Sequence, residues 1–202
     1  MTAPSVGTKA ALRRELRARR RGLSVMEHRR RSLAAARILA RLPQFGFGRR
    51  VALTLSFDRE IDTRPLIAAA RRRGVRLYTP VVVDKRRRLI RFYPLTAATR
   101  RGTFGIQVPT RTSRPLGSRW FDLVVVPLVG IDLNGRRLGM GGGFYDGAMA
   151  FRRRRLHWRG PRLLGHAFDC QRVATVHAEF WDLTLDALAT ESGLHLFFRG
   201  PT

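Results

Sequence analysis

The sequence predicts an α/β fold, a three-layer domain in which helices cover both faces of a mostly parallel sheet. Short runs rich in β-branched residues alternate with segments of helical periodicity along the chain. The run DLVVVPL at 122–128 is apolar at most successive positions, as strands buried on both faces are. The chain has 202 residues, 44% of them hydrophobic, so it can bury one substantial core.

Two helices are expected first. Residues 8–21 place leucine and alanine on a thin stripe among arginines, which predicts a strongly basic amphipathic helix. Ser24 and Glu27 have the spacing of a capping box, so a second helix should begin at Val25 and end near Pro43.

A strand and a third helix follow. The run VALTLSF at 51–57 predicts a short buried strand. The next helix should span 64–73, with Asp62 or Thr63 as its cap and Pro65 in the first turn, where proline is tolerated.

The middle of the chain predicts an antiparallel pair. Residues 75–83 and 89–95 have strand composition, and a polar break at Asp84 and Lys85 favours a hairpin between them. Residues 96–120 contain turn formers and no clear period.

The last third continues the alternation. A glycine-rich segment at 135–143 precedes a helix expected at about 144–155, and 163–169 and 185–191 predict two more strands. No repeat, linker or second domain is evident, so we expect a single domain over residues 1–202.

Basic residues dominate the charge. Forty Lys and Arg against 14 Asp and Glu give a formal net charge of +26, and only Lys9 and Lys85 are lysines. The electrostatic field of this charge attracts anions, whether nucleic acid, nucleotide or an acidic small molecule, and does not discriminate among them. The single cysteine, Cys170, excludes an internal disulfide and a multi-cysteine zinc site.

The N-terminal segment is basic and lacks the apolar core of a secretory signal. No stretch approaches the roughly 18 apolar residues of a membrane span. We therefore expect a cytoplasmic protein that does not bind membranes.

The clearest chemical signal lies at 124–146, where a hydrophobic strand runs into a loop with five glycines and then into a helix. Ligands of open α/β sheets bind at the carboxyl ends of the strands, and exposed backbone N–H groups with a helix N-terminus favour phosphate. Arg137 can add a bidentate contact to phosphate, and Asp146 can hold a magnesium ion. The alternative is a surface turn whose glycines only reverse the chain.

Familiar motifs are excluded. No Gly-Lys pair of a Walker loop occurs, and Phe144 stands where a dinucleotide fingerprint starting at Gly139 needs a small residue. The histidines lack metal-ligand spacing, and no Gly-x-Ser-x-Gly elbow is present.

The glycine loop is part of a longer string, GRRLGMGGGFYD at 135–146. Shorter segments accompany it: Lys9-x-x-Leu12-Arg13, Glu60-Ile61-Asp62-Thr63, Phe104-Gly105-Ile106, 122–132, Ala167-Phe168 with Gln171, and Glu179, Asp182, Leu185-Asp186 and Thr190-Glu191. In this order they resemble the 5-formyltetrahydrofolate cyclo-ligase (5,10-methenyltetrahydrofolate synthetase) family, whose loop is Gly-x-Arg-Leu-Gly-x-Gly-x-Gly-Tyr-Tyr-Asp.

The resemblance implies an ATP- and Mg²⁺-dependent ligase on a NagB/RpiA/CoA-transferase-like scaffold. The N5-formyl oxygen of 5-formyltetrahydrofolate would attack the γ-phosphate of ATP to give an N5-iminium phosphate. Ring closure by N10 would then yield 5,10-methenyltetrahydrofolate, ADP and phosphate. Such chemistry needs mainly positioning and charge neutralisation. ATP and the folate are the implied partners, without a specific nucleic acid, and the chain is expected to be a monomer.

The resemblance also assigns site residues. The expected ATP contacts are Lys9, Arg13, Arg137, Leu138, Gly139, Met140, Gly141, Gly142, Gly143, Phe144 and Tyr145. The expected folate contacts are Leu55, Glu60, Met140, Gly141, Gly142, Gly143 and Phe144. Asp146 and Asp182 would bind magnesium, and Arg137, Tyr145 and Asp146 are the expected catalytic residues. Without the resemblance, Arg13 could be a solvated helix residue, Glu60 a surface acid and Asp182 a helix cap.

Four positions depart from the family pattern. Phe144 replaces a tyrosine and Val108 a glutamate, while His177 and Trp181 stand where the family has proline and histidine.

Two other functions stay open. A basic RNA- or ribosome-binding protein would use the arginine runs at 19–21, 29–31, 71–73, 86–88 and 152–155. Aromatic residues are not interleaved with these runs as stacking platforms require. A phosphosugar isomerase or acyl-CoA transferase would explain the fold but not the glycine string.

Overall fold

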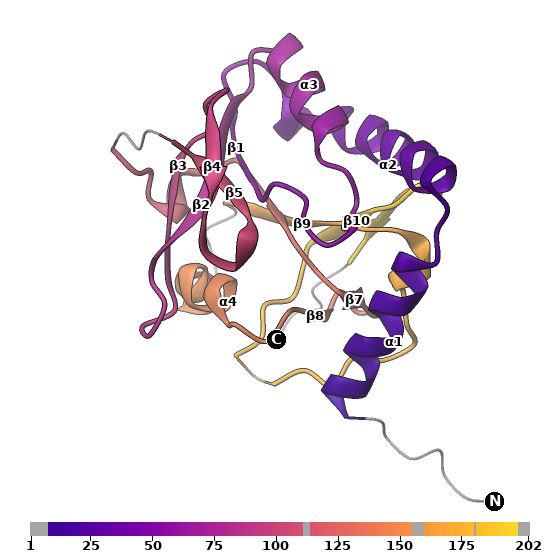
Figure 1. Cartoon of the computed structure of the whole chain (residues 1–202). Coiled ribbons are helices and arrows are strands. Elements are labelled where there is room, and N and C mark those ends of the chain that lie inside the picture. Colours follow the sequence, from indigo (N-terminus) through magenta and orange to yellow (C-terminus); the bar gives the residue numbers. More distant parts are fainter. Residues whose placement is uncertain (1–7, 111–113, 155–159, 180, 198–202) are drawn as a thin grey trace, which may run out of the picture.

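The computed structural model describes residues 8–110, 114–154, 160–179 and 181–197, and it confirms the α/β prediction (Figure 1). Its main sheet has the strand order β11-β10-β9-β6-β1-β2-β3. The strands are β1 (Arg50–Leu53), β2 (Arg76–Asp84), β3 (Leu89–Pro94), β6 (Leu123–Val126), β9 (Arg162–His166), β10 (Ala187–Ala189) and β11 (Leu194–Leu196). The five central strands are parallel, whereas β3 and β11 pair antiparallel at the two edges.

Four α-helices and two small strand pairs complete the described chain. The helices are α1 (Lys9–Arg21), α2 (Val25–Ala40), α3 (Arg64–Arg72) and α4 (Phe144–Ala148). The pairs are β4 (Thr99–Arg101) with β5 (Gln107–Pro109), and β7 (Gly130–Ile131) with β8 (Arg137–Leu138). Short 3₁₀ turns lie at Pro43–Phe45, Thr103–Gly105, Ser118–Trp120, Ala150–Arg154 and Asp169–Gln171.

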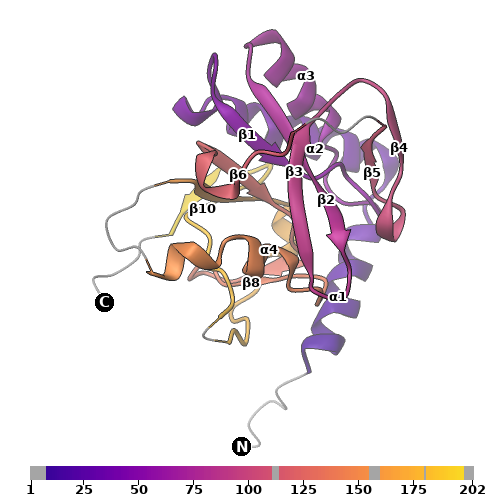
Figure 2. The ribbon, with the colours of Figure 1, turned by 90° about the vertical axis from the view of Figure 1, so that its left-hand side faces the viewer.

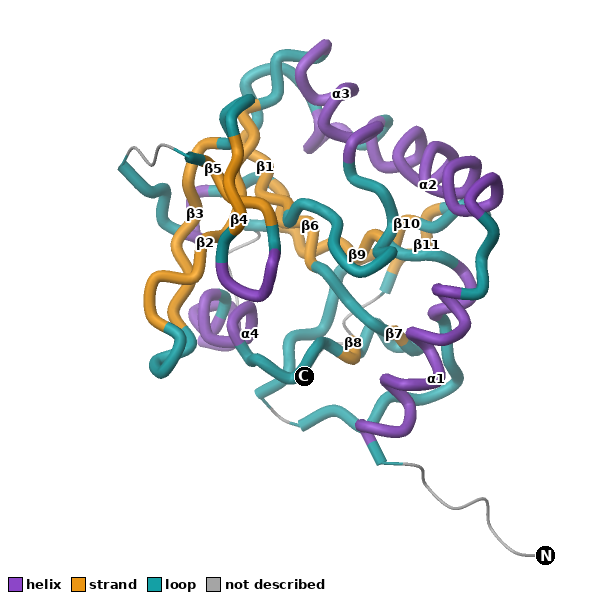
Figure 3. The backbone as a smooth tube through the Cα atoms, viewed as in Figure 1, coloured by secondary structure: helices purple, strands orange, loops and turns teal. Residues whose placement is uncertain are grey.

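The helices divide between the faces of the sheet (Figure 3). One face packs against α2 and α3 through residues such as Leu39 and Leu66. The other packs against α4 and the turn after it, where Met149 is fully buried against Val124 and Val126. Burying each such side chain contributes roughly 1.5–3 kcal/mol. The three-layer arrangement follows from strands that are apolar on both faces.

Helix α1 occupies a separate position beyond the carboxyl ends of the strands (Figure 1). Its Leu16 is completely buried against Val129, Leu138 and Val176. The thin apolar stripe expected in this helix is therefore its docking face, which brings the N-terminal helix beside the glycine-rich loop.

Capping side chains determine where α2 and α3 begin. Ser24 Oγ accepts from the Glu27 N–H at 3.2 Å, and Glu27 Oε2 accepts from the Ser24 N–H at 3.1 Å, which confirms the capping box and the start of α2. At α3, Asp62 Oδ1 accepts from the Arg64 N–H, whereas the Thr63 side chain makes no cap bond.

The predicted strand 51–57 ends at Leu53, because the chain leaves the sheet toward Asp58 and Arg59, which adopt left-handed φ of 50° and 57°. The predicted helix 144–155 ends at Ala148 and continues as a 3₁₀ turn to Arg154. Arg155 lies outside the described residues.

Other boundaries differ by a few residues, and some elements were not predicted. The strands expected at 163–169 and 185–191 are the shorter β9 and β10. The 96–120 segment contains β4 and β5, which lie beside the long β2–β3 hairpin (Figure 2). The edge strand β11 was also missed.

In the described part of the chain, no helix is both long enough and apolar enough to cross a bilayer.

Candidate active site

A cavity of about 860 Å³ opens where β1 and β6 end. Its wall contains Thr54 after β1, Pro127 after β6, and the glycine loop with α4. Most of the residues that the sequence predicts for the site line this cavity: Lys9, Arg13, Glu60, Arg137, Leu138, Gly139, Met140, Gly141, Gly142, Gly143, Phe144, Tyr145, Asp146 and Asp182. This volume is typical of small-molecule sites, and the position at the carboxyl ends of parallel strands is the one expected for ligands.

Buried Asp132 holds the turn at the start of the glycine loop. Asp132 Oδ1 accepts from the N–H groups of Asn134 and Arg136, both at 2.9 Å, and Oδ2 accepts from the Val176 N–H. Further along, Gly141 and Gly143 adopt left-handed φ of +94° and +66°. The loop thus turns in a way that other residues would resist.

Arg13 of α1 reaches into this loop. Its Nε–H donates to the Gly139 carbonyl at 2.8 Å, over a sequence separation of 126 residues. The structure therefore makes Arg13 a partner of the glycine loop rather than a solvated helix residue. Because α4 has only five residues, its macrodipole is short, and the loop backbone and the arginines are the stronger anion-binding groups.

Arg137 and Asp146 form an ion pair at the cavity wall. Arg137 Nη2 donates to Asp146 Oδ1 at 2.7 Å, and their side chains are only 7% and 17% exposed. The same oxygen accepts from the Leu183 N–H at 2.9 Å. One carboxylate thus links both ends of the loop to the C-terminal segment.

Tyr145 and Thr54 join α4 to the end of β1. Their hydroxyl oxygens lie 2.6 Å apart. Burial raises the pKa of Tyr145 well above its ordinary value, so the phenol stays protonated and can donate a hydrogen bond.

The departure at Phe144 keeps an aromatic contact. Its ring packs edge-on against Phe104, with centroids 6.0 Å apart, and Lys85 Nζ lies 5.4 Å from the Phe104 ring centroid. Val108, the second departure, is buried and also lines the cavity. His177 and Trp181 line it as well.

Lys9 and Asp182 meet at the cavity although 173 positions separate them in the sequence. Lys9 Nζ lies 3.5 Å from Asp182 Oδ2 and 3.5 Å from Glu179 Oε1. Asp182 Oδ2 also accepts from the Glu179 N–H at 2.9 Å, so this aspartate both closes a local turn and faces the cavity.

Glu60 lies on the loop that follows β1. Its Oε2 accepts from the Phe57 N–H at 3.4 Å. Burial raises the pKa of Glu60, and the positive charge of Arg20 opposes that effect. The residue is therefore a partly buried acid facing the cavity, unlike an ordinary surface acid.

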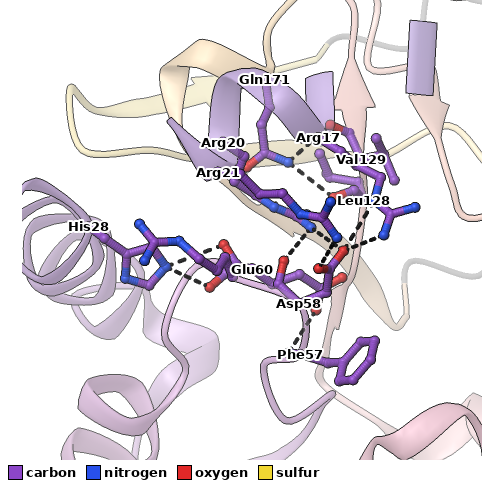
Figure 4. Close-up of polar contacts among 11 residues, drawn as sticks. Arg17, Arg20, Arg21, His28, Phe57, Asp58, Glu60, Leu128, Val129 and Gln171 are labelled. Atoms are coloured by element: carbon purple, nitrogen blue, oxygen red, sulfur yellow. Dashed lines mark hydrogen bonds and ion pairs between the residues drawn. The ribbon is translucent and has the colours of Figure 1, made fainter. Parts of the chain in front are cut away.

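Asp58 anchors the same loop to α1 (Figure 4). Its carboxylate receives hydrogen bonds from Arg17, Arg20 and Arg21. Partial burial would raise the pKa of Asp58, but the hydrogen bonds from Arg21 and Arg17 outweigh it, so the pKa lies below its usual value. This charge-assisted cluster holds the loop in its left-handed turn.

The described residues contain no group of three or more His, Cys, Asp or Glu side chains placed to hold a metal ion. Asp146 and Asp182 both line the cavity, but each is engaged by a cation, Arg137 or Lys9. Mg²⁺ is commonly held by one or two carboxylates together with substrate phosphates. The two aspartates fit that kind of site and do not form an all-protein cage.

Leu55 is the predicted site residue that the structure does not bring to the cavity. It packs against the core under α2 and α3, whereas its neighbour Thr54 lines the cavity. Sequence reasoning missed Thr54, Phe57 and Asp58. It also missed Arg87 and Arg88 as cavity residues. The sequence feature that contains Arg87 and Arg88 is the run of arginines at 86–88, between the two predicted strands. Composition alone could not assign this run to an anion-binding site.

Several arginines of the basic runs have structural partners. Arg20 is 1% exposed and donates to the Asp58 carbonyl, and Arg73 donates to the Ala40 carbonyl. Arg152 Nη2 binds both carboxylate oxygens of Asp186 at 3.0 Å. Part of the excess positive charge therefore lies on arginines that bind carboxylates or backbone carbonyls within the fold.

Comparisons with known proteins show which family this chain resembles. The model of the 5-formyltetrahydrofolate cyclo-ligase family matches residues 5–191. The chain is 34% identical over 184 residues to 5-formyltetrahydrofolate cyclo-ligase of Escherichia coli K12, covering 88% of this chain and 97% of the relative. It is 30% identical over 179 residues to that of Haemophilus influenzae, covering 86% and 92%. The NMR structure of Aquifex aeolicus 5,10-methenyltetrahydrofolate synthetase is similar with a TM-score of 0.79 at 28% identity, covering 96% of this chain and 95% of that one.

Proposed function

This chain belongs to the 5-formyltetrahydrofolate cyclo-ligase family, and from that premise we propose that it cyclises 5-formyltetrahydrofolate to 5,10-methenyltetrahydrofolate at the expense of ATP. Membership makes it a ligase of folate metabolism. The co-substrate, the metal and the residue roles below are our proposal.

The reaction proceeds in two steps. The N5-formyl oxygen attacks the γ-phosphorus of ATP, the bond to the β–γ bridging oxygen breaks, and ADP leaves. N10 then attacks the activated formyl carbon and loses its proton, and the C–O bond breaks to release phosphate. Phosphate is a far better leaving group than hydroxide, which is why a phosphoryl donor is required.

The glycine loop and its arginines suit the triphosphate. Arg13 and Arg137 supply positive charge beside backbone N–H groups, and Lys9 can reach the same anion from the start of α1. Phosphoryl transfer depends mainly on positioning and charge neutralisation, which these groups supply. Asp146 and Asp182 would hold Mg²⁺, which would neutralise phosphate charge. Tyr145, kept protonated by burial, can donate a hydrogen bond to an anionic oxygen.

The opposite side of the cavity suits the folate. The Glu60 carboxylate can accept hydrogen bonds from pterin N–H groups. The rings of Phe57, Phe104 and Phe144 offer apolar surface for a flat heterocycle. Arg87 and Arg88 are suited to anionic groups of either substrate.

One observation carries this proposal: the residues expected for ATP, folate and magnesium, drawn from both ends of the chain, line a single cavity, with Leu55 as the exception. Purified protein with ATP, Mg²⁺ and 5-formyltetrahydrofolate should produce the absorbance of the methenyl product. Reactions without ATP, or with Arg137→Ala, should stay flat. No rise with the complete mixture would reject the enzyme assignment.

The RNA-binding alternative is tested beside it. The arginine runs predict polyanion binding that disappears near physiological salt with a steep salt dependence and no sequence preference. Selective binding that persists at that salt would favour the alternative. We further propose a cytoplasmic monomer with one domain over residues 1–202, which gel filtration and limited proteolysis would test.

A further inference from the structure

A second, much smaller cavity of about 20 Å³ lies behind Glu60. Its polar lining comes from Arg20, Thr54, Glu60, Thr63, His166 and Gln171. Glu60 lines both cavities, as do Thr54 and Pro127, so the small cavity adjoins the substrate cavity at these residues.

Two of the lining side chains carry unsatisfied polar atoms. Arg20 is 1% exposed and His166 5% exposed. Within the described part of the chain, Arg20 Nε and Nη1 and both ring nitrogens of His166 have no hydrogen-bond partner. Buried polar groups are nearly always hydrogen-bonded, to protein or to ordered water, so this cluster requires an explanation.

The space fits one water molecule. A cavity needs at least about 10–15 Å³ of this volume to hold a water, and the water needs two to four polar partners. Gln171 is not one of those partners, because its Nε2 donates to the carbonyls of Leu128 and Val129 and its Oε1 accepts from the Phe168 N–H. Thr54 is bonded to the Tyr145 hydroxyl, and Thr63 Oγ1 accepts from the Ser56 N–H. Arg20 then offers a donor, and His166 and Glu60 offer acceptors.

We propose that one buried water bridges Arg20 and His166 to the carboxylate of Glu60, and that Arg20 is thereby a positioning residue for Glu60. The inference rests on the proposed function, in which Glu60 receives the pterin N–H groups. The water accepts from Arg20 and donates to His166 and to Glu60. The Glu60 carboxylate is thus held ionised and directed toward the folate.

Arg20 is fixed on its other side. Its Nη2 donates to the Asp58 carbonyl at 2.7 Å and lies 3.3 Å from Asp58 Oδ2 (Figure 4). Arg17 and Arg21 bind the same carboxylate, so the Asp58 end of Arg20 cannot move freely. The remaining N–H groups of Arg20 are left for the small cavity.

The charges around Glu60 are consistent with this arrangement. Arg20 and Arg17 favour its ionised form, whereas Asp58 and burial oppose it. Burial lowers the pKa of His166 to about 4, against a small opposing effect of Asp62, so His166 is neutral near pH 7 and one ring nitrogen can accept from the water. Burial thus raises the pKa of Glu60, and Arg20 is the charged group that opposes this effect most.

Three variants test the role of Arg20. Arg20→Met removes the charge, and Arg20→Lys retains it. Arg19→Gln is the matched control, because it removes a charge from the same helix at a residue that pairs with exposed Glu15 and lines neither cavity. For Arg20→Met, the KM for 5-formyltetrahydrofolate should rise about 10-fold, with kcat and the KM for ATP nearly unchanged. The acid limb of kcat/KM should move up by about one pH unit, since a nearby positive charge lowers a carboxyl pKa by about that much or more.

Arg20→Lys should restore most of the folate KM, and Arg19→Gln should match the parent protein. Equal losses for ATP and folate, an unmoved acid limb, or the same effect from Arg19→Gln would make Arg20 merely structural and overturn the proposal.

A crystal structure of the parent protein tests the water even if Arg20→Met fails to fold. Electron density for one water in hydrogen-bonding contact with Arg20, His166 and Glu60 is expected, and a dry cavity would overturn the inference. This outcome is independent of the absorbance assay, so a protein that holds the water but forms no methenyl product would contradict the proposed function alone.

Discussion

Arg137 Nη2 lies 2.7 Å from Asp146 Oδ1, and this contact closes the glycine loop on itself. Both side chains are largely shielded from solvent. Removing one partner of a buried ion pair leaves the other charge uncompensated, which costs far more than the pair contributes. The most informative substitutions in the site therefore involve this pair and the groups that touch the loop.

Asp146→Asn should lower turnover by about 100-fold and raise the Mg²⁺ concentration for half-maximal rate, because the charge is lost while an oxygen acceptor remains. Unfolding free energy should fall by about 1–3 kcal/mol, less than for full removal of a buried partner. The absorbance assay across a Mg²⁺ titration and urea unfolding measure these effects. Glu15→Gln, at an exposed pair with Arg19, is the control. An unchanged magnesium titration would remove Asp146 from the metal site.

Tyr145→Phe and Thr54→Val each break the same 2.6 Å hydrogen bond. Each should cost about 1 kcal/mol of stability, and the double variant should cost less than the sum, because only one interaction is lost. Thermal or urea unfolding of the four proteins gives the coupling energy. Strict additivity would mean that the two hydroxyl groups act independently.

Gly141→Ala should reduce activity strongly, because an alanine at φ +94° strains the loop by roughly 1–2 kcal/mol and displaces its N–H groups. Gly193→Ala is the matched control, since its added methyl group meets open space and its φ is ordinary. Comparing kcat and the KM for ATP in the two variants shows whether activity depends on the loop conformation. Equal activity in both would show that it does not.

Lys9→Gln should raise the KM for ATP by about 10-fold, the cost of one lost charged contact, with a stability change below about 1 kcal/mol. Its ion pairs with Glu179 and Asp182 are partly exposed and long, at 3.5 Å, so they add little to folding. Arg64→Gln, which breaks an exposed pair with Asp62, controls for general charge removal. A large drop in melting temperature with an unchanged KM would instead make Lys9 a structural residue.

His166 should make the fold acid-sensitive. Its pKa is lowered to about 4 in the folded chain by burial, against about 6.5 when unfolded, so the unfolded state takes up a proton first as pH falls. Stability from this group is complete above pH 6.5 and decreases by about 3 kcal/mol by pH 4. Urea unfolding of parent and His166→Leu proteins at several pH values measures the difference. Parallel pH profiles would contradict the assignment.

The sequence predicted those parts of the fold that depend on neighbours in the chain. The start of α2 follows from Ser24 and Glu27, which cap each other directly. The end of β1 was misjudged because Thr54–Phe57 continue a run of strand-like composition, whereas the turn at Asp58 is held by arginines of α1 about 40 positions away. Such long-range contacts leave no local signature.

The same contrast applies to the site. The glycine string is local and specific, so the loop could be identified from the sequence. Leu55 and Thr54 differ by one position, and adjacent residues of an extended chain point in opposite directions, so choosing the cavity residue required the fold. The small cavity beside Glu60 is lined by residues of α1, β9 and a loop, and no sequence pattern predicts it.

The docking of α1 has a consequence for synthesis on the ribosome. Lys9 and Arg13 emerge early, yet the groups they meet, Gly139 and Asp182, are made more than 120 residues later. Leu16 likewise stays exposed until Val176, which packs against it, has been synthesised. A nascent chain therefore exposes a basic, partly apolar helix for most of its translation, and the cavity closes only near the end. Asp58, which follows Arg17 and Arg21 of α1 by about 40 residues, can bind them well before Gly139 and Asp182 are made.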